Sequence, residues 1–205
     1  MKISEVRPAR RKDCWLVRLD DGTLLRVSER EIVQFSLYAG KELDENTLDA
    51  LQLSAGESAA KNKAISLVSA RPYAKKELER RLTRDGGVSP ADARSAVDWL
   101  EEIGLLNDRE FAKTLARHYG EKGYGEHKIK HELSGRGVPK EFWAAALAEL
   151  SDPQAALDAF VAKKLGEGSA DPKQMKKVSD ALLRRGYSWH DISAALRRHG
   201  ADPDQ

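Results

Sequence analysis

The stretch "KIKHELSGRGV", residues 128–138, places two apolar residues, Ile129 and Leu133, four positions apart and follows them after four more with Gly137. Residues four apart share one face of a helix, and a glycine just beyond them is typical of a helix end. The same pattern occurs twice more, in "ELERRLTRDGG" at 77–87 and in "KVSDALLRRGY" at 177–187. The chain therefore contains a repeated helical unit, and this repeat decides the fold.

Three positions of the unit correspond in all copies. The first apolar position is Leu78, Ile129 and Val178, the second is Leu82, Leu133 and Leu182, and the glycine is Gly86, Gly137 and Gly186. The copies are 51 and 49 residues apart, so the repeat is about fifty residues long. A period of this length is typical of repeat architectures.

Two further helices complete each copy. Helical periodicity precedes the glycine helix at 64–70, 110–119 and 156–165. A third helix follows it, and its start is marked by Ser89–Pro90, by Val138–Pro139 and by Ser188 with Asp191. A cap residue before a proline at the first helical position, or a serine with an acidic residue three positions later, is a helix-start signal.

The predicted fold class is mainly α, with three tandem three-helix repeats over 59–108, 109–151 and 153–201. A unit of fifty residues has little interior of its own. We therefore expect consecutive repeats to pack on their neighbours in an elongated or curved array.

Residues 1–55 form a different region, in which "CWLVRLDDGTLLRV" alternates apolar and polar residues as a β-hairpin does. A two-residue loop would set Val17 opposite Arg26. A three-residue loop, with Gly22 in the left-handed conformation, sets Val17 opposite Leu25 on one face. We favour the three-residue loop.

The sequence "SERE" at 28–31 has the spacing in which a serine and a glutamate cap each other's backbone donors. It predicts a helix from Glu29 to near Gly40. A further short helix is expected over 46–53, with "SAGES" at 54–58 as the joint to the first repeat.

The composition indicates a folded protein of the cytoplasm. Of 205 residues, 40% are hydrophobic and 33% charged, and no apolar run is long enough to cross a membrane. A single cysteine, Cys14, fits a reducing compartment. The net charge of +2, with basic and acidic residues interleaved, argues against a strongly cationic DNA coat.

The stretch from Leu106 to Gly137, together with "ARPYAKKELERRL" at 70–82, resembles the RecX family of bacterial regulators of the recombinase RecA. The residues that carry the resemblance are Arg71, Glu77, Leu78, Leu106, Asn107, Asp108, Phe111, Ala112, Arg117, Gly123, Gly125, Glu132, Leu133 and Gly137. It covers about residues 60–200 and does not include the amino-terminal hairpin.

The resemblance implies a non-enzymatic protein that binds RecA filaments on single-stranded DNA and lies in the filament groove. It would thereby limit strand exchange, ATP hydrolysis by RecA and the co-protease role of the filament. We expect a monomer in the cytoplasm, with no cofactor, no membrane contact and at most weak direct binding of single- or double-stranded DNA.

Helical geometry indicates where a partner would bind. With Leu78 and Leu82 turned inward, the cations Lys76, Arg80 and Arg84 fall on the outer side of the same helix. A charged outer face is also what a solvated helix shows. The candidate partner-binding residues are Arg71, Lys76, Arg80, Arg84, Arg117, Tyr124, His127, Lys128, His131, Lys176 and Arg184.

Arg117 is a separate candidate because it matches the family motif and an arginine can fork onto a carboxylate or a phosphate. The alternative is an internal ion pair with Asp108 or Glu132 that locks two helices. The sequence leaves both interpretations open.

Other chemistry has little support in the sequence. "YGEKGYGEHK" at 119–128 lacks the ending of a phosphate-binding loop and is interpreted as a turn, with Tyr124 as a contact or a base-stacking residue. His127 and His131 are one helical turn apart without an evident third metal ligand. No catalytic motif is found, and the alternative function is a DNA-binding protein that uses helix-turn-helix-like units.

Overall fold

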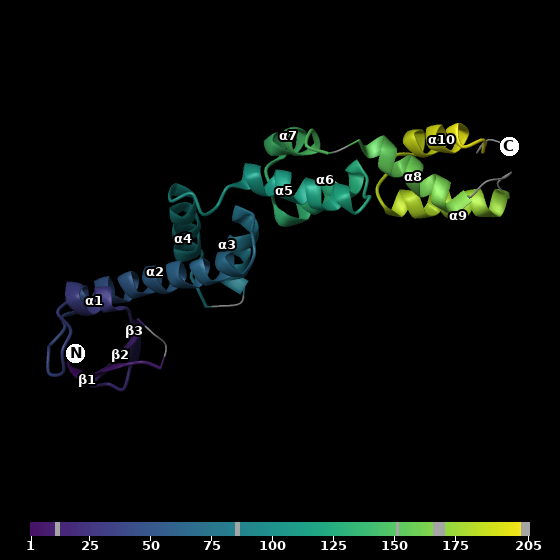
Figure 1. Ribbon diagram of the computed structural model, residues 1–205. Coiled ribbons are helices and arrows are strands. Elements are labelled where there is room, and N and C mark those ends of the chain that lie inside the picture. The colour runs from purple at the N-terminus through teal and green to yellow at the C-terminus, as the bar shows by residue number, and fades with distance from the viewer. Residues whose placement is uncertain (11–12, 85–86, 151, 166–170, 202–205) are drawn as a thin grey trace. The chain divides into compact units, whose positions relative to one another are not determined.

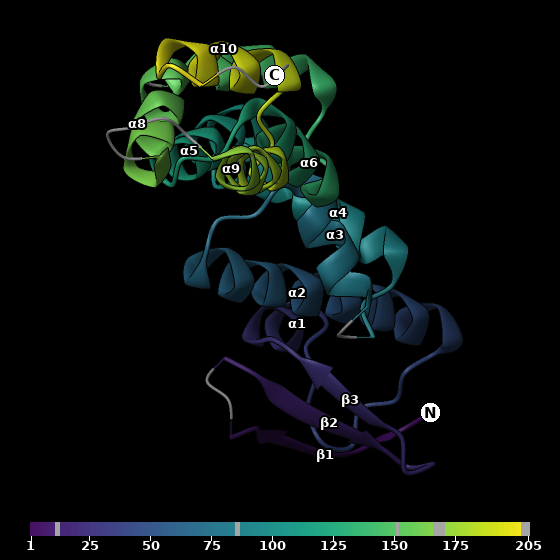
Figure 2. The same ribbon diagram turned by 90° about the vertical axis from the view of Figure 1, so that its right-hand side faces the viewer.

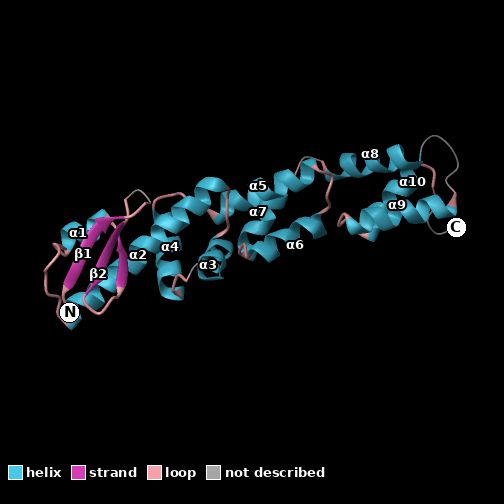
Figure 3. Cartoon of the chain, turned by 90° about the horizontal axis from the view of Figure 1, so that it is seen from below, coloured by secondary structure: helices cyan, strands magenta, loops and turns pink. Residues whose placement is uncertain are grey.

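A computed structural model describes residues 1–10, 13–84, 87–150, 152–165 and 171–201. Its strands all lie in the amino-terminal region and helices make up the remainder (Figures 1 and 3). In chain order the elements are β1 (Ile3–Pro8), β2 (Trp15–Leu19), β3 (Leu24–Val27), α1 (Glu29–Gln34), α2 (Glu45–Ala70), α3 (Lys75–Arg84), α4 (Pro90–Glu102), α5 (Asp108–Glu121), α6 (Glu126–Arg136), the 3-10 helix η1 (Lys140–Phe142), α7 (Trp143–Leu147), α8 (Pro153–Leu165), α9 (Pro172–Arg184) and α10 (Trp189–Arg198). The predicted mainly α fold class is confirmed.

The chain forms two compact units. The N-terminal unit comprises Met1–Tyr73 and Glu77–Leu106, and the C-terminal unit comprises Ala74–Lys76 and Asn107–Gln205. The N-terminal unit holds the sheet and most of the first repeat. The second and third repeats make up the C-terminal unit.

The hairpin adopts the predicted register. Val17 pairs with Leu25 across the antiparallel strands β2 and β3. The loop of three residues is closed by a hydrogen bond of 2.8 Å from the Leu19 N–H to the Thr23 carbonyl. Gly22 has a φ of 89°, a conformation that glycine adopts without the steric cost of a Cβ. The three-residue loop is therefore confirmed.

A third strand, β1, was not predicted from the sequence. It pairs antiparallel with β2, placing Val6 opposite Val17, and its Ile3 is only 1% exposed. Its register with β2 shifts between Ile3 and Glu5, so the apolar residues Ile3 and Val6 lie three positions apart and the alternation is lost. Glu5 and Arg7 form an ion pair of 3.2 Å. The sheet thus has the order β1-β2-β3.

Helix α1 begins at Glu29 as predicted but ends at Gln34, so the expected end near Gly40 is wrong. The Leu37 N–H returns to the Ile32 carbonyl at 2.9 Å, and Ser36 between them has a φ of 48°. This turn directs Leu37, which is 5% exposed, into the core. Burial of that side chain explains why the helix stops early.

Helix α2 is one continuous helix of 26 residues, so the expected short helix over 46–53 and the joint at 54–58 are both wrong. The hydroxyls of Ser54 and Ser58, one turn apart, donate to the Glu31 carboxylate at 3.0 and 2.7 Å. The Ser28 N–H donates to the same carboxylate at 2.8 Å. The serines therefore bind a buried acid instead of competing with the helix backbone.

The Glu31 side chain is buried against α2, at 0% exposure. Burial raises the pKa of its carboxyl, but hydrogen bonds from Ser28, Ser58 and Ser54 outweigh burial and hold that pKa below its usual value. The carboxylate is consequently ionised and fully bonded at neutral pH.

Helix α2 contributes to two hydrophobic cores. Its first half packs with α1 on one face of the sheet, where Leu51 is 0% exposed (Figure 2). Its second half places Ala60 and Ala64 in the core of the first repeat, with α3 and α4. At Gly56 a Cβ would lie 3.1 Å from Asp92 Oδ2, so glycine permits the close approach of α2 and α4.

The three-helix repeats have the predicted buried positions. The exposed fractions are 0% for Leu78, Ile129, Leu82, Leu133 and Leu182, and 4% for Val178. Gly137 and Gly186 end their helices at φ values of 77° and 87°. The third predicted helix stop, Gly86, lies outside the described residues.

The predicted starts of the third helices are confirmed in two of the copies. The Ser89 hydroxyl accepts from the Asp92 N–H at 3.1 Å, and Ser188 caps Asp191 in the same way at 3.1 Å.

In the second copy the expected start at Pro139 is wrong, because a 3-10 turn follows and α7 begins only at Trp143. The Trp143 indole donates to the Val138 carbonyl at 3.0 Å, where the other copies have a serine cap.

Candidate partner-binding surface

The second helix of each repeat has one buried and one exposed face. In α3 the cations Lys76, Arg80 and Arg84 are exposed, whereas the apolar residues of this helix are buried. Residues four apart lie on one side of a helix, so the three cations form a row at the surface. Their role in binding stays a prediction.

The equivalent positions in the other repeats are also exposed. They are His127, His131 and Gly135 on α6, and Lys176, Asp180 and Arg184 on α9. The candidate Lys128, by contrast, is half-buried and forms an internal ion pair, in which its ammonium lies 2.8 Å from the Glu132 carboxylate. The hydrogen bond from Lys128 lowers the pKa of Glu132, and the same bond raises the pKa of Lys128.

Arg71 is held by its neighbours at the turn after α2. Its Nη2 lies 2.9 Å from Glu77 Oε1, and its guanidinium carbon lies 3.7 Å from the centre of the Tyr73 ring. The hydrogen bond to Glu77 raises the pKa of Arg71. These contacts fix the turn between α2 and α3, so the residue has a structural role besides any contact with a partner.

Arg117 lies exposed on α5. The Asp108 carboxylate accepts from the Lys75 N–H at 2.8 Å, and Glu132 is paired with Lys128. Within the described residues, no hydrogen bond or ion pair joins Arg117 to Asp108 or Glu132. The internal pairing considered for Arg117 is therefore wrong.

Repeats two and three meet backbone to backbone. The Gly125 N–H donates to the Arg185 carbonyl at 2.9 Å, and the His127 N–H donates to the Gly186 carbonyl at 3.1 Å. A Cβ on Gly186 would lie 2.3 Å from the Lys128 nitrogen, and one on Gly125 would lie 2.4 Å from the Gly186 oxygen. Only glycine fits at these two positions. We call this contact the glycine junction.

The Arg185 side chain closes the glycine junction. Its Nη1 donates to the carbonyls of Lys122 and Gly123, each at 3.2 Å. Its guanidinium lies 4.7 Å from the Phe160 ring centre and 5.7 Å from that of Tyr124. Tyr124, predicted as a contact or base-stacking residue, is half-buried and lies beside this junction.

Sequence reasoning missed the glycine junction. "YGEKGYGEHK" is a turn between α5 and α6, as predicted. The extra glycine at 125 was a signal of close backbone approach, but its partner lies about sixty residues later in the chain. Local spacing does not reveal such a pairing.

A cleft of about 500 Å³ opens beside the glycine junction. Its lining combines carboxylates with leucines: Glu126, His127, Leu147, Leu150, Asp152, Gln154, Leu157, Gly186, Tyr187, Ser188 and Asp191. The Ser188 hydroxyl donates to Asp191 at 2.6 Å, and Asp152 accepts from the Gln154 N–H at 3.0 Å. These groups cap helix starts, which accounts for their presence.

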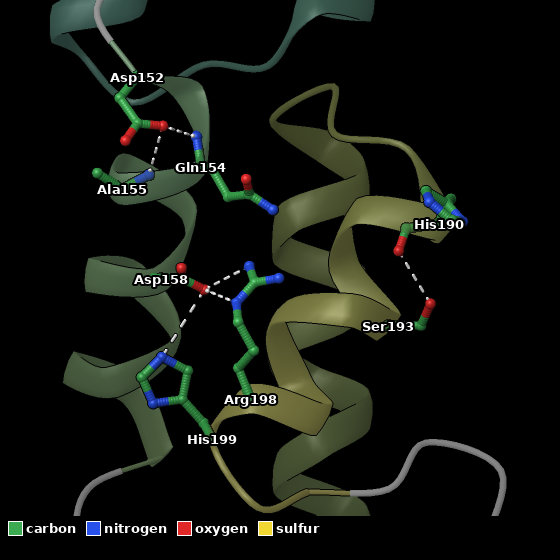
Figure 4. Close-up of polar contacts among 8 residues, drawn as sticks. All are labelled: Asp152, Gln154, Ala155, Asp158, His190, Ser193, Arg198 and His199. Carbon is green, nitrogen blue, oxygen red and sulfur yellow. Dashed lines mark hydrogen bonds and ion pairs between the residues drawn. The ribbon is translucent and has the colours of Figure 1, made fainter.

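An ion pair joins the first and last helices of the third repeat (Figure 4). Asp158 Oδ1 on α8 accepts from Arg198 Nη2 at 2.7 Å and from Arg198 Nε at 3.2 Å. The His199 ring lies 3.8 Å from the same oxygen. The pair fixes α8 against α10.

Across the residues described above, no group of three potential metal ligands is found. Nor does any helix there combine the length and apolar character needed to cross a membrane.

Comparison with known proteins gives matches over most of the chain. The family models described as RecX second and third three-helix domains match residues 107–147 and 151–196. A regulatory protein RecX from Xanthomonas axonopodis pv. citri (strain 306) is 36% identical over 138 residues, 66% of this chain and 84% of the relative. One from Stenotrophomonas maltophilia (strain R551-3) is 35% identical over 144 residues, 69% of this chain and 86% of the relative.

Solved structures share the fold. A crystal structure of regulatory protein RecX matches with a TM-score of 0.70 at 20% identity and covers 97% of this chain and 98% of that chain. The crystal structure of RecX from Lactobacillus salivarius matches with a TM-score of 0.59 at 22% identity, covering 71% and 97%. The first of these covers nearly the whole chain, so the likeness extends into the amino-terminal sheet region.

Proposed function

The chain belongs to the RecX family, and from this premise we propose that it is a non-enzymatic regulator that binds RecA filaments on single-stranded DNA. It inhibits or modulates strand exchange, ATP hydrolysis by RecA and the co-protease activity of the filament. It acts in the cytoplasm and needs no cofactor.

One observation supports this function beyond family membership. The outer face of the second helix is exposed in every repeat, at Lys76, Arg80, His127, His131 and Lys176. A filament presents one protomer surface at regular intervals, and a repeat protein presents matched surfaces in series. Exposed faces that recur in each repeat are therefore suited to bind a filament, in which one protomer surface recurs.

The test mixes the full chain with RecA, single-stranded DNA and ATP. We expect the rate of ATP hydrolysis to fall at substoichiometric to stoichiometric amounts of the protein. Strand exchange should fall in parallel. An unchanged rate over this range would overturn the proposal.

The contribution of α3 is tested with the triple variant Lys76→Glu, Arg80→Glu, Arg84→Glu. These side chains are exposed, so circular dichroism should show nearly unchanged helicity while co-sedimentation with the filament weakens. The triple variant Arg26→Glu, Arg30→Glu, Lys63→Glu makes the same charge change elsewhere and serves as the control. Equal losses in both variants would assign the effect to net charge instead of to α3.

A further inference from the structure

Among the described elements, helices cover only one face of the three-stranded sheet. Helices α1 and α2 pack on the face that carries Val17 and Val27 (Figure 2). Residues directly opposite each other on paired strands share a face. Two cross-strand rows therefore make up the other face, and they are Glu5–Arg18–Leu24 and Arg7–Leu16–Arg26. We call these six residues the arginine face.

The arginine face is open to solvent. Arg7, Arg18 and Arg26 are all exposed, and Leu16 is half-buried. Strand pairing sets Leu16 between Arg7 and Arg26 in its row. The face therefore presents cations around an apolar side chain.

The charge on the arginine face is not balanced. Glu5 pairs with Arg7 at 3.2 Å and with Arg18 at 3.4 Å. Arg26 forms no ion pair with any residue that the structure describes. Three arginines against one carboxylate give the face a net charge of +2. The face therefore attracts an anionic partner.

Sheet stability does not account for this composition. Arg18 lies diagonally across from both Arg7 and Arg26. Diagonal neighbours in a sheet are within reach of long side chains, so these like charges repel each other. A solvated sheet face is expected to carry polar residues, yet Leu24 is 45% exposed here. A local preference that is broken without a structural gain indicates a function.

The chemistry of the arginine face favours an acidic protein segment. Arginine is enriched at protein interfaces and lysine is depleted there, and this face has no lysine. A guanidinium can fork onto a carboxylate through two parallel hydrogen bonds. Leu16 and Leu24 offer apolar contacts that a phosphate backbone does not use, and the Glu5 carboxylate would repel phosphates. A second copy of the chain would oppose the same cations, which disfavours self-association through this face.

We propose that the arginine face binds an extended acidic protein segment that carries carboxylates and apolar side chains on the same side. Every second side chain of an extended chain points the same way. A segment that crosses the strands sets an apolar side chain on Leu16 and a carboxylate on the arginine at either end of that row. This goes beyond the proposed function because it gives the amino-terminal sheet a partner of its own.

The test follows the anisotropy of a fluorescently labelled peptide, Glu-Ser-Leu-Ser-Glu-Ser-Leu-Ser-Glu, as the full chain is added. The peptide places carboxylates and leucines on one side when extended. The variant Arg7→Gln, Arg18→Gln, Arg26→Gln should weaken binding about tenfold. The variant Leu24→Ser should weaken it about threefold through loss of apolar contact. Circular dichroism checks that both variants are folded.

The matched control is Arg30→Gln, Arg94→Gln, Arg109→Gln, which removes three exposed arginines from α1, α4 and α5 and should leave the affinity nearly unchanged. Absence of binding up to about 1 mM protein, or an equal loss in the control, would overturn the proposal. Equal affinity for a peptide with serine in place of leucine would also overturn it, since attraction would then be charge alone. DNA that displaces the peptide and depends on the same three arginines would instead assign the face to phosphates and refute the acidic segment.

Discussion

In the N-terminal unit a single helix, α2, belongs to two cores, whereas in the C-terminal unit the second and third repeats keep separate cores and meet at the glycine junction. The two halves of the N-terminal unit are coupled by apolar burial along α2. The buried carboxylate of Glu31 in addition joins α1 to the middle of α2. The halves of the C-terminal unit are coupled by backbone hydrogen bonds and by Arg185.

The two units should differ in whether local unfolding of one part destabilises the other part of the same unit. When a helix shared by two cores unfolds as a whole, it exposes apolar surface in both of them. Two cores joined through hydrogen bonds can open separately, because a net hydrogen bond contributes only about 0.5 to 1.5 kcal/mol. We therefore expect the N-terminal unit to unfold cooperatively and the third repeat to have its own opening free energy.

Equivalent core truncations in the two units test this comparison most strongly. Leu82→Ala and Leu133→Ala remove matched, fully buried side chains, and each should lower the free energy of unfolding by about 2 to 5 kcal/mol. Hydrogen exchange should show that Leu82→Ala also speeds exchange in the sheet, while Leu133→Ala leaves α9 and α10 protected. Loss of protection in α10 equal to that in α6 would contradict the separate cores.

The glycine junction is tested by Gly186→Ala. Its control is Gly200→Ala, which has a similar positive φ of 72° and open space around the added Cβ. The control should cost about 1 to 2 kcal/mol from the left-handed conformation alone. Gly186→Ala should cost about 1 to 3 kcal/mol more, because the Cβ meets backbone atoms of Lys128. Urea unfolding measures both, and equal costs would show that the junction tolerates the extra atom.

The buried carboxylate is tested by Glu31→Gln, which should cost about 1 to 3 kcal/mol at pH 7 by disrupting the hydrogen bonds from the serines. The pKa of Glu31 is lowered in the folded state, so its stabilising contribution is present above the unfolded pKa and is lost as pH falls through the folded pKa. The difference in unfolding free energy between wild type and variant should therefore be constant from pH 7 to about 5 and shrink below that. The exposed neighbour variant Glu29→Gln should show little difference at any pH; a similar loss there would refute the special role of Glu31.

The features that sequence predicted are local and periodic. Ile129, Leu133 and their counterparts repeat at helical spacing, so their burial follows from the pattern. The hairpin register follows from the alternation around Gly22, since a slip of one residue would turn the buried face outward.

The features that sequence missed depend on tertiary contacts. "SAGES" has the composition of a joint, but Ser54 and Ser58 are used by a carboxylate more than twenty residues earlier. Strand β1 has its apolar residues Ile3 and Val6 three positions apart, because its register with β2 shifts between Ile3 and Glu5, so it lacks the simple alternation that marks a strand.

For the candidate partner-binding surface too, the sequence predicted the local features and missed the tertiary contacts. Exposure of Lys76, Arg80 and the equivalent histidines could be predicted from the helical period. The involvement of Tyr124 and Arg71 in internal contacts could not, because ring and guanidinium contacts depend on where neighbouring helices end.

The continuity of α2 constrains how the chain can change in length. Each residue of an α-helix turns by about 100°, so inserting one residue between Leu51 and Ala64 would rotate one core-facing stripe away from the other by that angle. Ser54 and Ser58 would then point in a new direction relative to Leu51 or relative to Ala64, depending on where the residue is inserted. Insertions or deletions in this segment should therefore disrupt one of the two cores, unless they add or remove about seven residues, which is two whole turns. The loop between β2 and β3 is not constrained in this way.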